Sequence, residues 1–419
     1  MAREPCCRDQ TALDRLTPGV AHHLDAAVGQ IFREEAGRVT ASLTRRFRNF
    51  ELAEDCTQEA FIEALRVWPT KGAPERPGAW LLRVAERRAL DRLRRDQRFA
   101  AKVAGLPFPE PDGGDDRLRL MFVCCHPALS REAQVALTLR VVAGLSTAQI
   151  ARGFLISEVS LAQRITRAKR KVVAAGIPFR MPAPSDLEAR LAEILAVLYL
   201  MFNEGYLAST WETSHDRSLA EDATWLASLV ARVLPSQAEV LGLLALFKLH
   251  SARVGARFAS DGSLTLLADQ DRSLWDTKAI REGTELLDRA AELRSPGPYQ
   301  LQAAISSCHA LAPAWAATDW AIILRLYDRL LEFLPTPVVR LNRAVTLWHV
   351  SGPAMALREV DALLPELERY HLLHSTRAEL LAELGRSLEA REAWEHALGF
   401  TLNPAERRHI QARAGSFTD

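Results

Sequence analysis

Five side chains between residues 160 and 171 have the types and spacing of a nucleic-acid contact surface. They combine hydroxyl, amide and cationic groups, and they are Ser160, Gln163, Arg164, Arg167 and Lys171. Such groups hydrogen-bond to base edges, and the cationic ones also neutralise phosphates. Because residues three and four apart share a helix face, one helix would present all five together. We predict a DNA-binding face here, with an ordinary solvated basic face as the alternative.

A second basic row occurs earlier in the chain, on an expected helix over residues 75–98 that starts near Pro77. The row consists of Arg83, Arg87, Arg94 and Arg98. Seven basic residues stand against three acidic ones between positions 83 and 98. Trp80 precedes the row and offers a flat ring on which an unstacked base can lie. This helix is therefore a second candidate for contact with DNA.

An acidic helix face over residues 53–68 has the opposite character. Its polar members are Asp55, Gln58, Glu59 and Glu63, while Phe61 and Leu65 are expected to turn inward. Carboxylates repel DNA, so this face fits a basic protein surface better.

Two apolar stripes must hold the basic faces in place. Ser146 and Gln149 have the spacing of a capping box that starts one helix, "ISE" interrupts it, and a second helix begins at Glu158. The inward stripe of the second helix is Leu161, Ile165, Ala168 and Val172, and that of the earlier basic helix is Leu81, Ala85, Ala89 and Leu93. The later pair of helices therefore predicts a helix-turn-helix.

The whole chain is expected to be all-α, because apolar residues recur at steps of three and four and strict alternation is almost absent. Breaks rich in Pro and Gly divide it. The predicted parts are a small helical domain at 20–100, a flexible linker at 101–115, the helix-turn-helix domain at 116–176, a helical extension at 186–295 and a repeat region at 298–413.

The last part contains an internal repeat. Ala344 and Ala378 lie 34 residues apart, as do Ala356 and Ala390, and as do Val360 and Trp394. This period resembles that of tetratricopeptide repeats, whose stacked helix pairs form a groove for a protein partner. The alternative is a plain helical bundle with accidental similarity.

Composition and charge exclude several classes of protein. Apolar residues make up 48% of the 419, and no apolar run suggests a membrane span or a signal peptide, so we expect a cytoplasmic protein with no membrane contact.

The net charge of +1 conceals an asymmetry between the two halves of the chain. Residues 1–180 carry 30 Lys and Arg against 21 Asp and Glu, and the remaining residues carry 23 against 31. The basic half is the candidate for nucleic acid.

The sequence motifs give little support for a metal site or for catalysis. Zinc at Cys124, Cys125 and His126 would require neighbouring residues to splay apart, and buried or capping roles are the simpler interpretation. Calcium at Asp269, Asp271 and Ser273 lacks the usual Gly and Glu, so a capped turn is expected. Phosphate-binding loops and nucleophile motifs are absent from the sequence. We expect no metal, no cofactor and no catalytic residue.

These motifs together resemble a known family. The order "EDCTQEAF", "PGAWLLRVAERRALDRLRR", a Pro/Gly-rich linker and "LSTAQIARGFLISEVSLAQRITRAKRK" is similar to that in bacterial sigma-70 factors. It resembles the small extracytoplasmic-function group, which has only domains two and four. The closest resemblance is to the subgroup with a C-terminal extension of tetratricopeptide-like repeats.

The resemblance implies partners and site residues. Residues matching the segment that binds the β′ clamp helices of core RNA polymerase are Asp55, Gln58, Glu59 and Phe61, with Glu63 on the same face. Residues matching the helix that approaches the minus-10 promoter element are Arg83, Arg87, Arg88, Asp91 and Arg94. The loop "TKGAPERPG" corresponds to one that captures a flipped base, but it has no aromatic residue between Trp68 and Trp80. Ser160, Gln163, Arg164 and Arg167 match the helix that recognises the minus-35 element.

The resemblance implies a promoter-specific sigma factor, which is not itself an enzyme. The first alternative is a helix-turn-helix regulator that binds DNA without polymerase and carries a repeat domain for protein partners. Such a regulator would leave the acidic face and the helix at 75–98 unexplained. The second alternative is a repeat scaffold with an incidental basic domain.

Overall fold

The computed structural model describes residues 31, 35–95, 116–154, 156–208, 219–259, 263–401 and 404–415. In these ranges every regular element is a helix, and the only strand-like pairing there is an isolated bridge between Phe258 and Leu264. The all-α prediction is therefore confirmed. Contacts divide the chain into two compact units, Met1–Glu204 and Gly205–Asp419. The predicted linker at 101–115 lies outside the described residues, as do residues 20–30 of the first predicted domain.

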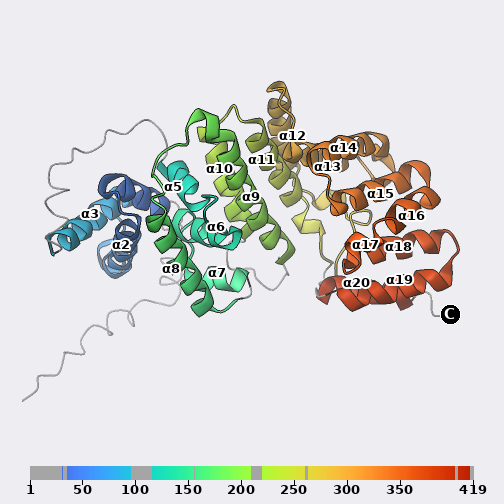
Figure 1. Ribbon diagram of the computed structural model, residues 1–419, viewed down its shortest axis with the longest axis horizontal. Helices are drawn as coiled ribbons and strands as arrows, with labels where there is room; N and C mark the ends of the chain where they lie inside the picture. The colour runs from blue at the N-terminus through green and yellow to red at the C-terminus, as the bar shows by residue number, and fades with distance from the viewer. Residues whose placement is uncertain are drawn as a thin grey trace, which may run out of the picture. The chain divides into compact units, whose positions relative to one another are not determined.

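Among the described residues of the first unit, a helical segment at 35–47 precedes α2. The elements that follow are α2 (Phe50–Lys71), α3 (Pro77–Arg95), α5 (Asp116–Cys124), α6 (Arg131–Leu137), a π-helix (Thr138–Val142), α7 (Thr147–Gly153), α8 (Glu158–Ala174) and α9 (Pro184–Ala208), whose last turn crosses into the second unit (Figure 1).

The segment at 35–47 packs with α2 and α3 into one core. Val39, Leu43 and Phe47 meet the buried face of α2 there. The predicted stripe of α3 is buried along its whole length: Leu81, Ala85, Ala89 and Leu93. Phe61 is also buried, but Leu65 is 50% exposed, so the expectation that it turns inward is wrong. Leu65 lies one residue after the buried Ala64, which holds the inward position on that turn of α2.

Local hydrogen bonds define the two helices of the predicted helix-turn-helix. The backbone amide of Ser146 donates to Gln149 Oε1 at 2.9 Å, and the amide of Gln149 donates to Ser146 Oγ at 3.1 Å. The capping box is therefore confirmed, and α7 follows it directly. α8 begins at Glu158, as predicted, with Ser157 as its N-cap. Its predicted inward stripe is buried: Leu161, Ile165, Ala168 and Val172.

Helix α9 packs against the helices that precede the helix-turn-helix. Arg190 Nη2 donates to the carbonyl of Phe122 at the end of α5, at 2.5 Å. Arg131, the first residue of α6, places Nη1 2.9 Å from Glu193 Oε2. These contacts make the first helix of the extension part of the first unit.

The second unit consists of short helices joined by tight connections. They are α10 (Leu219–Val233), α11 (Ala238–Ser251), 3₁₀ turns at Val254–Ala256, Arg272–Leu274 and Trp315–Ala317, α12 (Thr277–Glu292), α13 (Pro298–Leu311), α14 (Trp320–Phe333), α15 (Pro337–Ser351), α16 (Pro353–Asp361), α17 (Leu364–Leu367), α18 (His371–Glu383), α19 (Ser387–Phe400) and α20 (Pro404–Gly415).

The internal repeat corresponds to two successive helix pairs. α15 packs on α16, α18 packs on α19, and α16 packs on α18 (Figure 1). The repeat positions are all buried: Ala344, Ala356, Val360, Ala378, Ala390 and Trp394. Each pair turns at a glycine with positive φ, Gly352 at 82° and Gly385 at 74°. Because L side chains rarely adopt that conformation, glycine suits both turns.

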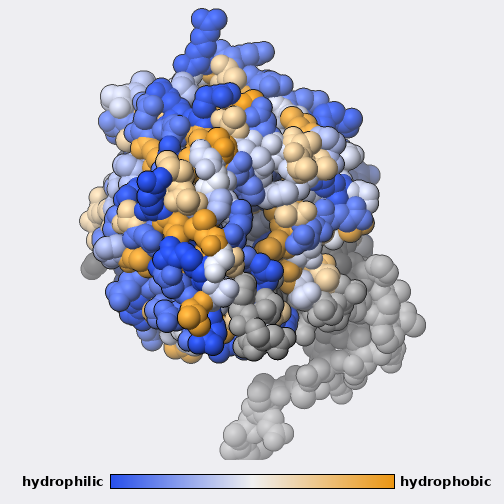
Figure 2. Space-filling model, turned by 90° about the vertical axis from the view of Figure 1, so that its right-hand side faces the viewer, coloured by the Kyte–Doolittle hydropathy of each residue, from blue (hydrophilic) through white to orange (hydrophobic). Residues whose placement is uncertain are grey.

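The outer surface of the C-terminal helices is mixed. Figure 2 shows hydrophobic residues in separate patches among hydrophilic ones on the face turned to the viewer. Exposed apolar side chains of these helices include Val350, Met355, Leu372 and Leu388. No helix within the described ranges has the length and apolar character that crossing a bilayer requires.

Candidate nucleic-acid interface

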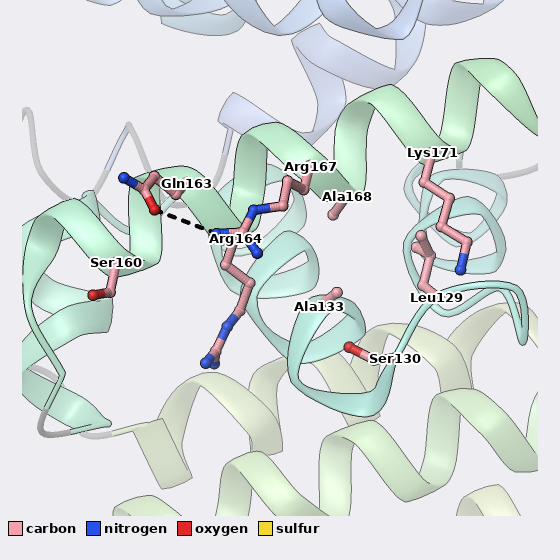
Figure 3. A pocket seen from close by; sticks show the side chains of 9 residues that line it. All are labelled: Leu129, Ser130, Ala133, Ser160, Gln163, Arg164, Arg167, Ala168 and Lys171. Atoms are coloured by element: carbon pink, nitrogen blue, oxygen red, sulfur yellow. Dashed lines mark hydrogen bonds between the residues drawn. The ribbon is translucent and has the colours of Figure 1, made fainter.

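The five polar residues predicted on α8 line one depression of about 390 Å³, with Leu129, Ser130, Ala133 and Ala168 completing its wall (Figure 3). Figure 3 shows Arg164 and Lys171 extending from α8 on either side of the turn that carries Ser130 and Ala133. The structure therefore brings these side chains together on one face, beside the buried stripe, whose Ala168 forms part of the wall. Three cationic groups in one open depression suit a polyanion.

Polar contacts order part of this face. Arg167 Nη2 donates to Gln163 Oε1 at 3.3 Å, which is the dashed line in Figure 3. The Ser160 hydroxyl lies 2.8 Å from the hydroxyl of Ser157, the N-cap of the same helix. Gln163, Arg167 and Lys171 stay exposed, so their remaining hydrogen-bonding capacity is open to a ligand.

Helix α3 presents its basic row on the side away from the core. Arg83, Arg87 and Arg94 are exposed, and Asp91 Oδ1 lies 3.5 Å from Arg94 Nη1. Arg98 lies outside the described residues. Trp80 is half-buried, with its ring centroid 5.4 Å from that of Trp68 and the planes tilted by 60°. One part of the Trp80 ring therefore supports the core and the rest remains accessible.

The acidic face of α2 is interleaved with guanidinium groups of α3. Arg92 contacts Asp55 at 3.0 Å and Glu59 at 2.5 Å. Arg88 Nη2 lies 3.6 Å from Glu63 Oε2, so a predicted DNA-binding residue pairs with a predicted polymerase-binding one. The carboxylate side chains of Asp55 and Glu59 remain 45% and 35% exposed, so a partner can still reach them. Hydrogen bonding to Asp55, opposed by burial and assisted by Glu59, raises the pKa of Arg92.

Phe61 differs from the other residues of this set. Its exposure is 2%, and it belongs to the core formed with α3. In this conformation it supports the acidic face from beneath and offers no surface to a partner.

Sequence reasoning missed the residues that link the two predicted domains. Glu54 lies on α2 and is buried, yet it pairs with Lys169 of α8, and its Oε1 lies 3.4 Å from Arg140 Nε of the π-helix. Gln58 Nε2 donates to the same carboxylate at 2.5 Å. Burial lowers the pKa values of Lys169 and Arg140. No sequence signal identified this pairing, because its members lie more than 80 residues apart in the chain.

The cysteine pair considered for zinc lies in the core of the first unit. Burial raises the pKa of Cys125 to about 12 and that of Cys124 well above its usual value. Cys125 Sγ lies 3.4 Å from Thr138 Oγ1. The turn considered for calcium is a capped one, in which Asp271 Oδ1 accepts a hydrogen bond from the amide of Ser273 at 2.9 Å.

Three family models match the chain in succession. Sigma-70 region 2 matches residues 31–99, and Sigma-70 region 4 matches residues 119–172. A family of unknown function, DUF6596, matches residues 190–291. The first range contains α2 and α3, and the second contains α6 and α7 with most of α5 and α8.

Similar proteins fall into two groups. An uncharacterized protein of Rhizobium meliloti is 44% identical over 384 residues, which are 88% of this chain and 91% of that protein. The ECF RNA polymerase sigma factor SigK of a Mycobacterium species (strain KMS) is 30% identical over 33% of this chain and 78% of its own length. SigK of Mycobacterium tuberculosis (strain H37Rv) is 28% identical over 38% of this chain and 91% of its own length.

Proposed function

The chain belongs to the extracytoplasmic-function group of the sigma-70 family, and from this premise we propose that it binds core RNA polymerase through α2 and directs promoter-specific initiation through α3 and α8. A sigma factor supplies promoter recognition, while the polymerase supplies the catalysis. The observation that carries the proposal is the convergence of Ser160, Gln163, Arg164, Arg167 and Lys171 in one exposed depression.

In this proposal α8 reads the minus-35 element. Its exposed amide and guanidinium groups hydrogen-bond to base edges in the major groove, as the second helix of a helix-turn-helix does. Lys171, at the far end of the depression, contacts a phosphate.

Helix α3 faces the minus-10 element. Arg83, Arg87 and Arg94 neutralise phosphates, and the accessible part of Trp80 stacks on an unpaired base. Arg88 and Asp91 contribute to the same DNA contact from α3, although Arg88 also forms an ion pair with Glu63. The loop that precedes α3 captures a flipped base through its backbone and polar groups.

Helix α2 provides the polymerase contact through Asp55, Gln58, Glu59 and Glu63, and the partner is the clamp helices of the β′ subunit. Phe61 contributes by fixing α2 on the core beneath these side chains. Partial exposure of Asp55 and Glu59 supports a direct contact with a basic partner surface.

The test is initiation with purified core polymerase on genomic DNA, with transcript starts mapped by sequencing. We expect a defined set of starts that requires the protein and disappears in a variant with Arg164→Ala and Arg167→Ala. Selection no better than that of core polymerase by itself would refute the proposal. A regulator that acts without polymerase would instead bind duplex DNA alone and leave the starts unchanged.

The extension is proposed as a regulatory or interaction module. Two buried repeats with glycine turns support tetratricopeptide-like stacking, and the groove of such a stack is the candidate site for a protein partner. The test compares the full chain with one ending after Ala208, which retains the first unit and α9. Equal polymerase binding and equal initiation by the two forms would exclude regulation by the extension under those conditions.

A further inference from the structure

A second depression, of about 210 Å³, adjoins the DNA-facing one, because Arg164 lines both. This depression, the apolar pocket, is surrounded by four elements of the first unit: α6, the turn after α7, α8 and α9. None of its apolar side chains has a place in the proposed function. They are Val135, Ala136, Phe154, Leu161 and Leu200.

The apolar pocket has room for a compact apolar group. A cavity of about 150 Å³ lined by apolar side chains takes up benzene, so the larger volume of this pocket accommodates a branched or aromatic side chain. Val135, Ala136 and Leu161 are buried, whereas Leu200 is 40% exposed. A ligand that covers Leu200 removes apolar surface from water, which favours binding.

Two groups of opposite charge at the apolar pocket are available to a ligand. Among the residues that the structure describes, none forms a hydrogen bond or ion pair with the guanidinium of Arg164 or with the carboxylate of Glu204. Figure 3 shows Arg164 extending away from the hydrogen-bonded pair of Gln163 and Arg167. A cation and an anion beside one apolar pocket complement a ligand that carries both charges and an apolar body.

The other two charged residues of the apolar pocket are already engaged. Arg131 Nη1 lies 2.9 Å from Glu193 Oε2. Glu132 accepts hydrogen bonds from its own amide and from the Ser130 hydroxyl, and these, with a smaller effect of Arg164, lower the pKa of its carboxyl group. Arg164 and Glu204 are therefore the groups that remain for a ligand.

We propose that the apolar pocket binds an apolar α-amino acid, or a zwitterion of the same form, which competes with promoter DNA for Arg164. The carboxylate of the ligand pairs with Arg164 and its ammonium group pairs with Glu204. The apolar part of the ligand packs on Phe154, Leu161 and Leu200. One guanidinium cannot make full contacts to the ligand and to DNA at once, so each weakens binding of the other by the same factor. This competition rests on the proposed function.

The first test measures binding to the free full-length protein by calorimetric titration. We expect L-phenylalanine and L-leucine to bind saturably. Hydrocinnamate lacks the ammonium group of phenylalanine and phenethylamine lacks its carboxylate, so each is expected to bind at least about fivefold more weakly than phenylalanine. Equal affinity for these three compounds would show an apolar site without charge recognition and would overturn the proposal. Absence of saturable binding of both amino acids up to about 10 mM would also overturn it.

Substitutions at the two charged residues test which group of the ligand each one contacts. Glu204→Gln should weaken phenylalanine binding at least about fivefold and leave hydrocinnamate binding unchanged, because hydrocinnamate has no ammonium group. Arg164→Gln should weaken binding of phenylalanine and hydrocinnamate and leave phenethylamine unchanged. Glu188→Gln, at another exposed position on α9, is the control and should change none of the three. Equal losses for all three compounds in Glu204→Gln and in Arg164→Gln would contradict the assigned contacts.

The second test adds L-phenylalanine to the complex of polymerase, protein and promoter and measures promoter affinity by fluorescence anisotropy. At saturation we expect promoter binding to weaken about threefold to tenfold, which is the effect expected for removal of Arg164. Glu204→Gln should keep the wild-type promoter affinity in the absence of the amino acid and lose the response at the same concentration. Saturable binding of phenylalanine with unchanged promoter affinity would refute the competition.

Failure of this inference and failure of the proposed function are distinguishable. A wild-type chain that directs polymerase to no promoter would refute the proposed function. The calorimetric titrations use the free protein, so they would still decide whether the apolar pocket binds the amino acid.

Discussion

Arg92 of α3 places Nη1 3.0 Å from Asp55 Oδ2 of α2, and its other terminal nitrogen contacts Glu59. One guanidinium thus spans two carboxylates that share a helix face. Its positive charge offsets the repulsion between the carboxylates of Asp55 and Glu59. The two ion pairs also fix both side chains relative to the core. Arg92 is one of the seven basic residues between positions 83 and 98, and its spacing in the sequence indicated no particular role.

Arg92→Ala is expected to lower the free energy of unfolding of the first unit by about 1 kcal/mol, because partly exposed ion pairs contribute little. Scanning calorimetry of the full chain measures the effect. Arg95→Ala, at an exposed position in the last turn of α3, is the control. Equal losses in both variants would contradict a specific role for Arg92.

Ser146→Ala is expected to lower the free energy of unfolding of the first unit by about 1 kcal/mol, because it removes the cap of α7. Ser146→Asp should retain most of the stability, since a carboxylate caps equally well. The measurement is again calorimetric. Thr166→Ala removes a hydroxyl that donates to the carbonyl of Ala162 within α8 and should cost much less.

Arg164→Ala and Arg167→Ala, made separately, are expected to weaken promoter binding by the polymerase complex about threefold to tenfold. The plot of log affinity against log salt has a negative slope. Each substitution should reduce the magnitude of that slope by about one if its guanidinium contacts a phosphate. Fluorescence anisotropy across a salt series provides both quantities. Arg391→Ala, on α19, should change neither, and an equal effect there would point to general electrostatics.

The second unit is expected to lose stability as the pH falls below about 6.5. Burial, with smaller contributions from Arg253, Arg257 and His309, lowers the pKa of His250 to about 3, whereas the unfolded chain has an ordinary value of 6.5. Between these values the unfolded state binds a proton that the folded state does not. The free energy of unfolding therefore falls by up to about 1.4 kcal/mol per pH unit.

His250→Asn should flatten this pH dependence between pH 6.5 and 4, even if it lowers stability at neutral pH by disturbing the contact with Ser306. His309, whose pKa burial lowers to about 4, accounts for part of the slope that remains. The exposed His396 is the control position. Denaturant titrations at several pH values test the prediction, and an unchanged slope in His250→Asn would contradict it.

Sequence patterns identified the elements whose formation depends on near neighbours. The capping box of Ser146 and Gln149 involves groups three residues apart. The buried stripes of α3 and α8 repeat with the helix period, so the positions of the exposed basic residues could be predicted from them. Leu65 shows the limit of such patterns, because Ala64 fills the inward position on the same turn and leaves the larger side chain outside.

By itself, the sequence determined the all-α class, the helix-turn-helix and the clustering of cationic side chains on α8, since helix period and capping act over a few residues. Only the tertiary structure decided which charges meet: Arg92 with Asp55 and Glu59, and Glu54 with Lys169 and Arg140. Those pairings depend on how separate helices pack, and packing brings together side chains that no local spacing relates. The tertiary structure also buries Glu54, and a buried carboxylate is strongly destabilising unless a cation pairs with it.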